Sequence, residues 1–340
     1  MRVFVSLLIS LTLPILIIYG LWAMADLPNK KDNGFHRKIL MGQFEEISRS
    51  ILKKQTTAIL GTYGKYTFLE TDDPRFLLKF NNDSYQTSVM TIGNFSPSLG
   101  NKKYKYQLLG AQLYRYDRSG EVEIFNLDNN IPKLFSRFEA PPVIYYVPIS
   151  DNRYGYLKYT GIETFKQFCI GRFNGVTISC DTGNAILSEP KGLIADGQLN
   201  FDDSTQTFVY THYYKNEVTT FDTSLHLKNI VHTIDTVTNS LKEGENGARF
   251  AINQKSCVHD GLLYISSNLK ADNESRSHYT RHIPIDIYDI KAASYSGSFY
   301  LPVSKGKLIK SMKFISRYKI LVLYHSNELR LFTVRDLFNL

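Results

Sequence analysis

Hydrophobic and polar positions repeat along this chain in one short pattern. An apolar residue, two further strand-type residues, a large ring or Cys, and then Asp, Asn or Thr follow one another at six places. The fourth positions are residues 80, 125, 180, 221, 288 and 332, so the intervals run from 41 to 67 residues. A strand-type repeat of about fifty residues is typical of four-stranded propeller blades. The six stretches are Leu77–Asn81, Val122–Asn126, Thr177–Asp181, Val218–Asp222, Ile285–Asp289 and Leu329–Thr333.

The residues ahead of these stretches predict hairpins. Runs such as Gln112–Tyr116, Phe208–Tyr214 and Ile320–Tyr324 are apolar and aromatic, and polar turn residues separate each run from the repeated stretch after it. A strand, a tight polar turn and a second strand form a β-hairpin. We therefore expect an all-β fold, a six-bladed β-propeller, with seven blades as the alternative.

The last blade lacks an outer strand of its own. Residues 309–314, 319–325 and 328–334 supply three strands, and residues 44–54, ahead of the first blade, are apolar enough to supply the fourth. A ring that pairs its two ends within one sheet leaves no open sheet edge between first and last blades. We expect residues 43–340 to form one propeller, closed by pairing of the N-terminal and C-terminal strands.

Residues 1–25 differ from the rest of the chain. No charged residue occurs from Val3 to Ala25, and twenty-three residues in a helix are long enough to cross a bilayer. Ala23-Met24-Ala25 matches the small-residue pattern of a signal-peptide cleavage site, so removal of the segment is an alternative. We favour an uncleaved transmembrane anchor, followed by a basic tether over residues 26–42 that could rest on anionic lipid headgroups.

The charges around this anchor give conflicting indications of its orientation. Only Arg2 precedes the apolar run, whereas Lys30, Lys31, Arg37 and Lys38 come after it, and the positive-inside tendency would then place the β domain in the cytoplasm. An N-terminal apolar segment with almost no leading tail normally directs export of the domain attached to its C-terminal end. We give this export signal more weight and expect an extracytoplasmic domain, in the periplasm or on the cell surface.

The charge of the chain bears on its partners. The formal net charge is +8, but the basic residues are spread out, without a dense Lys/Arg run. Together with export, this distribution argues against nucleic acid. We expect contact with a membrane through the N-terminal helix, and a protein partner or a small ligand on one face of the propeller.

Motifs of known chemistry do not point to an enzyme. The sequence has no Cys-x-x-Cys-His, no Cys/His set with zinc spacing and no Gly-x-Ser-x-Gly turn. We therefore name no catalytic residue, no metal ligand and no cofactor, and expect a protein-interaction or ligand-binding module. The alternative is the propeller subunit of an envelope oxidoreductase, or another propeller enzyme.

The fifth repeat carries an unusually long insertion. Its hairpin turn is expanded into Asn268–His282, and long polar insertions at the edge of a scaffold are common places for function. The charged and His side chains of this insertion are our candidate partner-binding residues: Asp272, Glu274, Arg276, His278, Arg281 and His282. His278 and His282 would share one face of a helix at a spacing able to bind a metal, but no third ligand can be named.

Two of the three cysteines could form a disulfide. Asn174-Gly175 is a strong two-residue hairpin turn. With that turn, the residue numbers of any two residues that face each other across the hairpin add up to 349, and 169 plus 180 is 349. Cys169 and Cys180 would then face each other within disulfide range. The alternative is a pair of reduced thiols packed between blades.

Three segments resemble a known group of proteins. Gly261–Asn268, Pro284–Ile290 and Ser298–Pro302 are similar to blades of uncharacterised six-bladed propellers of the NHL/YVTN/TolB-like group of bacterial cell-envelope proteins. The likeness covers roughly the last 230 residues and rests on generic blade features. It implies an extracytoplasmic propeller that binds or scaffolds, and it carries over no catalytic residue.

Overall fold

The computed structural model describes most of the β domain and two short N-terminal pieces. The described residues are 12–20, 33–40, 43–93, 104–117, 119–127, 132–139, 145–150, 153–159, 166–173, 178–181, 186–187, 196–238, 240, 250–306 and 308–335.

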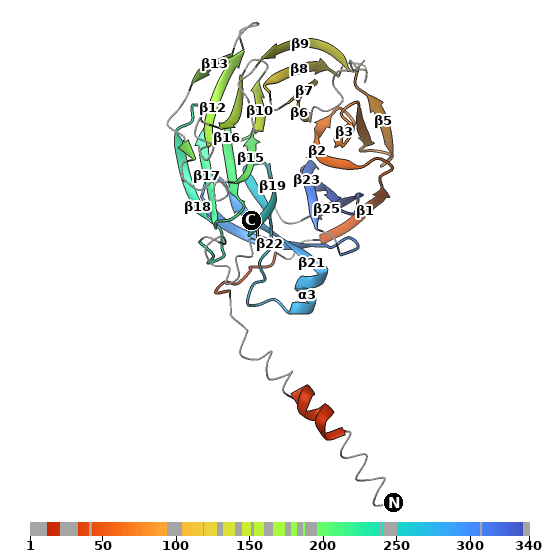
Figure 1. The fold of residues 1–340 in the computed structure, drawn as a ribbon, viewed down its shortest axis with the longest axis vertical. Coiled ribbons are helices and arrows are strands. Elements are labelled where there is room, and N and C mark those ends of the chain that lie inside the picture. The colour runs from red at the N-terminus through yellow and green to blue at the C-terminus, as the bar shows by residue number, and fades with distance from the viewer. Residues whose placement is uncertain are drawn as a thin grey trace, which may run out of the picture.

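Six antiparallel sheets stand around a common axis (Figure 1). In blades one to five the four main strands follow one another in the chain. Blade one contains β2 (Thr56–Tyr63), β3 (Tyr66–Thr71), β4 (Phe76–Asn81) and β5 (Thr87–Thr91), and blade two contains β6 (Lys105–Leu109), β7 (Gln112–Tyr116), β8 (Glu121–Asn126) and β9 (Lys133–Glu139). Blade three contains β10 (Tyr145–Ser150), β11 (Arg153–Tyr159), β12 (Lys166–Phe173) and β13 (Ile178–Asp181), with the short β14 (Ile186–Leu187) beside β12. Blade four contains β15 (Gly197–Asp202), β16 (Thr207–His212), β17 (Glu217–Asp222) and β18 (Leu227–His232). Blade five contains β19 (Asn253–His259), β20 (Leu262–Ser267), β21 (His282–Asp289) and β22 (Ser294–Pro302). The expected six-bladed β-propeller is confirmed.

Blade six is built from both ends of the β domain. Its strands β23 (Ile309–Ser316), β24 (Lys319–Tyr324) and β25 (Glu328–Arg335) come from the C-terminal region, and β1 (Gln43–Ile51) lies antiparallel to β25 as the outer strand. The pairing runs from Gln43 opposite Arg335 to Ile51 opposite Glu328. The ring is therefore held shut by a hydrogen-bonded ladder between segments far apart in the chain.

The hydrophobic core is divided among the interfaces between blades. Six clusters of buried side chains each combine residues of two neighbouring blades, and together they cover every interface of the ring. The cluster between blades three and four, for example, packs Phe168 edge-on against Phe208 with ring centroids 4.8 Å apart. Alternating strand residues supply this packing, because the two faces of each sheet contact the two neighbouring blades.

The repeated pattern marks the third strand in five of the six blades, as β4, β8, β17, β21 and β25 show. Blade three is the exception. Thr177–Asp181 overlaps β13, which is the outer strand, and the third strand is β12. This copy is also the one with Cys in place of the ring. The copy that deviates in sequence is thus the one that lies on the outer strand and not on the third.

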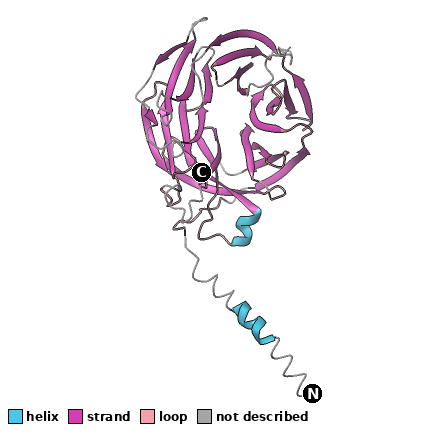
Figure 2. Cartoon of the chain, viewed as in Figure 1, coloured by secondary structure: helices cyan, strands magenta, loops and turns pink. Residues whose placement is uncertain are grey.

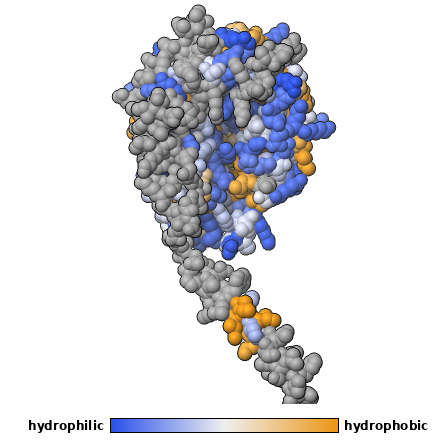
Figure 3. Space-filling model, in the orientation of Figure 1, coloured by the Kyte–Doolittle hydropathy of each residue, from blue (hydrophilic) through white to orange (hydrophobic). Residues whose placement is uncertain are grey.

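Residues 12–20 are helical, and the apolar side chains among them are exposed, for instance Leu16 at 65% and Ile18 at 66%. Figure 3 shows these residues mostly in the hydrophobic colour, whereas the visible described surface of the propeller is mostly hydrophilic. No helix among the residues described is long and apolar enough to span a bilayer. The anchor predicted over residues 1–25 lies outside the described residues except for this short piece.

Candidate functional site

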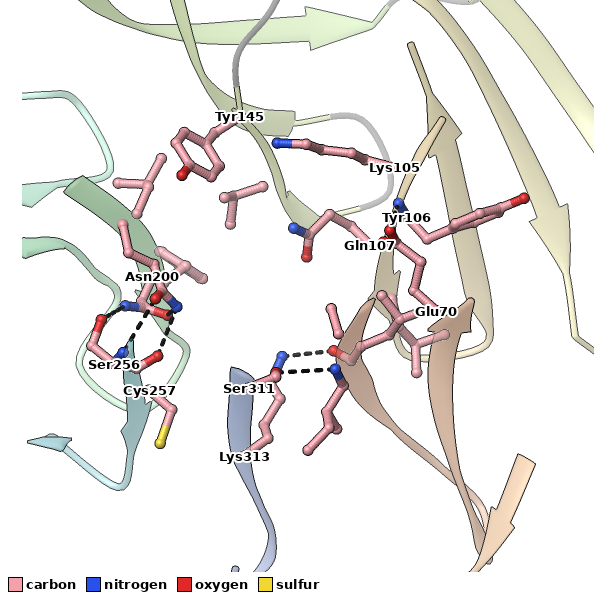
Figure 4. Close-up of a pocket in the computed structure, with 18 of the residues that line it drawn as sticks. Glu70, Lys105, Tyr106, Gln107, Tyr145, Asn200, Ser256, Cys257, Ser311 and Lys313 are labelled. Atoms are coloured by element: carbon pink, nitrogen blue, oxygen red, sulfur yellow. Dashed lines mark hydrogen bonds between the residues drawn. The ribbon is translucent and has the colours of Figure 1, made fainter. Parts of the chain in front are cut away.

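A cavity of about 500 Å³ lies on the axis of the ring. It is lined by the first strand of every blade, namely β2, β6, β10, β15, β19 and β23. Figure 4 shows side chains from these strands converging on one space. Because each of these strands belongs to a different sheet, no single segment of the chain contains the site.

Alternation along the strands decides which side chains reach the axis. On β15, Gln198 and Asn200 point toward the cavity and its rim, and Leu199 between them is buried in the hydrophobic cluster of blades three and four. On β6, Lys105 and Gln107 line the cavity, and Tyr106 between them is 2% exposed. Burial therefore alternates with a period of two residues along these strands, although the buried Leu199 and Tyr106 also border the cavity.

Four lysines line the cavity: Lys105 on β6, Lys255 on β19, and Lys310 and Lys313 on β23. Lys310 Nζ donates to the Thr56 carbonyl at 2.6 Å, and Lys313 Nζ donates to the Leu60 carbonyl at 2.7 Å. Lys105 Nζ lies 4.8 Å from the centroid of the Tyr145 ring, a cation–π contact.

Burial lowers the pKa of three of these lysines. It lowers the pKa of Lys255, and the nearby charge of Lys310 lowers it further. Burial also lowers the pKa of Lys310 and of Lys313, although Asp72 and Glu70 partly offset this for Lys310. Desolvation disfavours the ammonium form, and a negative charge placed among these groups would favour it again.

Glu70 is the half-buried carboxyl of the cavity wall. It accepts hydrogen bonds from Thr57 Oγ1 at 2.8 Å and from the Tyr106 backbone N–H at 3.2 Å. Burial raises the pKa of Glu70, whereas these hydrogen bonds and the charges of Lys105 and Lys310 lower it, with burial the larger effect. Glu70 therefore holds β2, β3 and β6 together and balances part of the lysine charge.

Polar contacts in the cavity wall also connect blades to one another. The Gln198 amide donates to the Ser256 carbonyl at 2.7 Å and accepts from the Ser256 N–H, which joins blades four and five. Ser311 Oγ accepts from the Ile59 N–H at 3.0 Å, which joins blades six and one. These contacts connect the first strands of neighbouring blades, and Lys310 and Lys313 of blade six are each held by a carbonyl of blade one.

The predicted insertion lies between β20 and β21, where the sequence placed it, and contains the helix α3 (Arg276–Arg281) that projects beside blade five in Figures 1 and 2. Its acidic residues contact the chain's own N-terminal segment, residues 33–40. Glu274 forms an ion pair with Arg37 at 2.8 Å, and Asp286 on β21 forms a second at 2.8 Å. The Arg37 side chain is 0% exposed.

Backbone groups of the same segment are also bound by the insertion. The Asp272 carboxylate accepts from the N–H groups of Asn33 and Gly34 at 2.7 and 2.9 Å. The Asn273 side chain accepts from the Arg37 N–H and donates to the Arg37 carbonyl. We name residues 33–40 together with these insertion residues the clamp. It attaches the tether to blade five, and no pattern in the sequence indicates this attachment.

The remaining predicted insertion residues divide into two kinds. Arg276 and Arg281 are exposed. The rings of His278 on α3 and of His282, the C-cap residue that begins β21, do stack, with centroids 4.1 Å apart. However, His282 Nδ1 lies 3.0 Å from the His278 carbonyl oxygen, and both rings pack on Tyr300. No group of three or more His, Cys, Asp or Glu side chains suited to a metal occurs within the described ranges.

The register predicted for the two cysteines is wrong. Cys180 lies opposite Gly171, and the numbers of cross-strand partners between β12 and β13 add up to 351. The reason is the connection, because β12 ends at Phe173 and β13 begins at Ile178, so more than two residues join them. Cys169 and Cys257 are both buried.

Comparison with known proteins adds no relative. No protein-family model matches the chain, and no curated protein shows significant similarity to it. The structure shows the six-bladed architecture that the resemblance to the NHL/YVTN/TolB-like group implies.

Proposed function

We propose that this protein is a ligand-binding module whose site is the axial cavity. One observation carries the proposal: six blades place their first strands around a space of about 500 Å³ and send four lysine side chains to its wall. Volumes of this size are typical of small-molecule sites. Charged groups at the mouth of a cavity are costly to hold together unless a ligand or a structural bond uses them.

The same proposal places the propeller outside the cytoplasm on a membrane anchor. It is supported by the uncharged run from Val3 to Ala25 and by the exposed apolar side chains of residues 12–20. The clamp adds a physical argument, since a tether attached at several points would hold the propeller at a defined distance from the bilayer. Membership of the NHL/YVTN/TolB-like cell-envelope group belongs to this proposal as well.

A cavity-filling variant tests the binding function. Gln107 extends from β6 into the cavity (Figure 4), so Gln107→Trp would occupy part of the space. Purified full-length protein in neutral detergent is screened by thermal shift against a chemically diverse metabolite collection, with wild type and variant side by side. We expect compounds that raise the Tm of wild type and not of the variant. A screen in which no compound distinguishes the two folded proteins would refute the function.

Localisation is tested separately. We expect the intact chain to stay in the membrane fraction after an alkaline carbonate wash, and externally added protease to digest the propeller once any outer barrier is permeabilised. A propeller protected until the inner membrane is lysed would overturn the extracytoplasmic assignment and leave the binding proposal untouched.

A further inference from the structure

We infer that the axial cavity takes a small anion with two or more negative charges. This inference rests on the proposed function and specifies the chemical class of its ligand. It is based on the charge balance of the wall, on one lysine without a hydrogen bond or ion pair, and on two lysines that line the wall from neighbouring blades.

The charges of the lining do not cancel. Lys105, Lys255, Lys310 and Lys313 face two carboxylates, Glu70 and the exposed Asp203, which leaves an excess of two positive charges. Since Glu70 is already hydrogen-bonded to Thr57 and Tyr106, it is held at the side of blades one and two. A dianion would complete the balance, and the attraction is stronger inside a partly dehydrated cavity than in bulk water.

Lys255 is the side chain that most lacks a counterpart. Within the described part of the chain its ammonium has no hydrogen bond and no ion pair. The Tyr213 ring lies 5.9 Å from Nζ, and the charge of Lys310 is also near. The residue is half-buried, so water satisfies it only in part. A lysine held in this way supplies three donors to an incoming acceptor.

The position of Lys255 explains why the anion would bind at one side of the axis. Neighbouring blades are joined along the wall by attractive contacts, for instance Gln198 with Ser256 and Tyr145 Oη with the Gly197 carbonyl at 3.1 Å. Between blades five and six, the contacting strands β19 and β23 instead bring two like charges, Lys255 and Lys310, to the wall. An anionic group placed between them would turn this repulsion into two charge-assisted hydrogen bonds.

The remaining lining limits the ligand further. Tyr145 and Gln107 add a hydroxyl and an amide on the opposite wall (Figure 4), which suits a ligand that carries hydroxyl groups beside its charges. A volume of about 500 Å³ accommodates a phosphorylated sugar or a tricarboxylate and excludes a folded protein or a nucleic-acid duplex.

Isothermal titration calorimetry tests the inference with glucose 6-phosphate, citrate and pyrophosphate, and with glucose as the neutral control. The full-length protein is titrated in neutral detergent at low ionic strength. We expect at least one of the three anions to bind and glucose not to bind. Lys255→Met should weaken that binding about tenfold or more, since it removes a charge-assisted hydrogen bond. Lys291→Met, which removes an equal charge from an exposed turn, should stay within about twofold of wild type.

Three results would overturn the inference: no binding of any of the three anions to wild type, equal binding of glucose, or equal affinity in wild type and a folded Lys255→Met. These are distinct from failure of the proposed function. Neutral compounds that bind wild type and not Gln107→Trp would sink the anion class alone, whereas a screen with no such compound would sink the site itself.

Discussion

Substitution of Arg37 by Met is predicted to loosen the N-terminal segment and to destabilise blade five. The Arg37 guanidinium makes five hydrogen bonds, to both oxygens of Asp286, to Glu274, to the Leu269 carbonyl and to Ser267 Oγ, at 2.8 to 3.2 Å. Burial alone would lower the pKa of Arg37, but Asp286 and Glu274 raise it above its ordinary value. The Met side chain would leave both carboxylates, 4% exposed or less, without their cation.

The expected cost is a consequence of this burial. Removal of one member of a buried ion pair costs about 3 to 5 kcal/mol, because the other charge is left uncompensated. In a domain of this size about 2 °C of Tm corresponds to 1 kcal/mol, so the Tm should fall by about 6 to 10 °C. Glu274→Gln in the Arg37→Met background should recover part of the loss, since it removes one of the orphaned charges.

Thermal unfolding followed by circular dichroism measures the change, and limited trypsin digestion measures the release of residues 33–40 through cleavage after Lys38. Arg49→Met is the matched control, because Arg49 also pairs with two carboxylates, yet its side chain is 55% exposed. Exposed pairs contribute little to stability, so this variant should unfold close to wild type. A folded Arg37→Met with wild-type Tm and wild-type digestion rate would refute the clamp.

Packing and protonation support three further predictions. Gly155→Ala should lower stability by about 1 to 3 kcal/mol, because the added Cβ would lie 2.5 Å from two ring carbons of the fully buried Phe208. Denaturant titration measures this change in stability, and an unchanged midpoint would contradict the packing between blades three and four. Affinity for the cavity anion should fall as pH rises from 7 toward 10.5, because the lowered pKa values of Lys255 and Lys310 make both ammonium groups lose their protons before an exposed lysine does. Tyr213 beside Lys255 and Glu70 beside Lys310 do not add positive charge over this range. Calorimetry at pH 7, 8.5 and 10 should therefore show a steady decrease in affinity, and constant affinity would count against these lysines. Burial raises the pKa of the Cys257 thiol to about 12, so iodoacetamide at pH 8 should leave Cys257 unlabelled in the folded protein and label it in denaturant; rapid labelling of the native protein, read by mass spectrometry, would show that β19 opens.

Local pattern was sufficient for the fold because propeller strands pair with their neighbours in sequence. Alternation and turn residues along Gln112–Asn126, for example, predict the hairpin that β7 and β8 form. Local pattern was misleading in blade three, where the connection between two strands is longer than the two-residue turn that the sequence indicates. The turn at Asn174-Gly175 predicted one register, and the longer connection between β12 and β13 set another, since loop length determines register in a hairpin.

The candidate site could not be predicted in the same way. Lys105, Lys255 and Lys310 are separated by 150 and 55 residues and each is unremarkable in its own strand. A signal was present, since polar residues alternate along the first strand of several blades, but it becomes visible only once those strands are known to face an axis. Similarly, nothing in the order of residues connected Arg37 with Glu274 and Asp286.

The sequence by itself determined the all-β fold and most of the strands, and it favoured six sheets over seven, because these features depend on alternation, turns and spacing along the chain. The tertiary structure decided what the charged residues do, because closing six sheets into a ring brings distant first strands around one axis and lays the tether on blade five. Charge interactions depend on distance in space, and that distance is fixed only when the ring has closed.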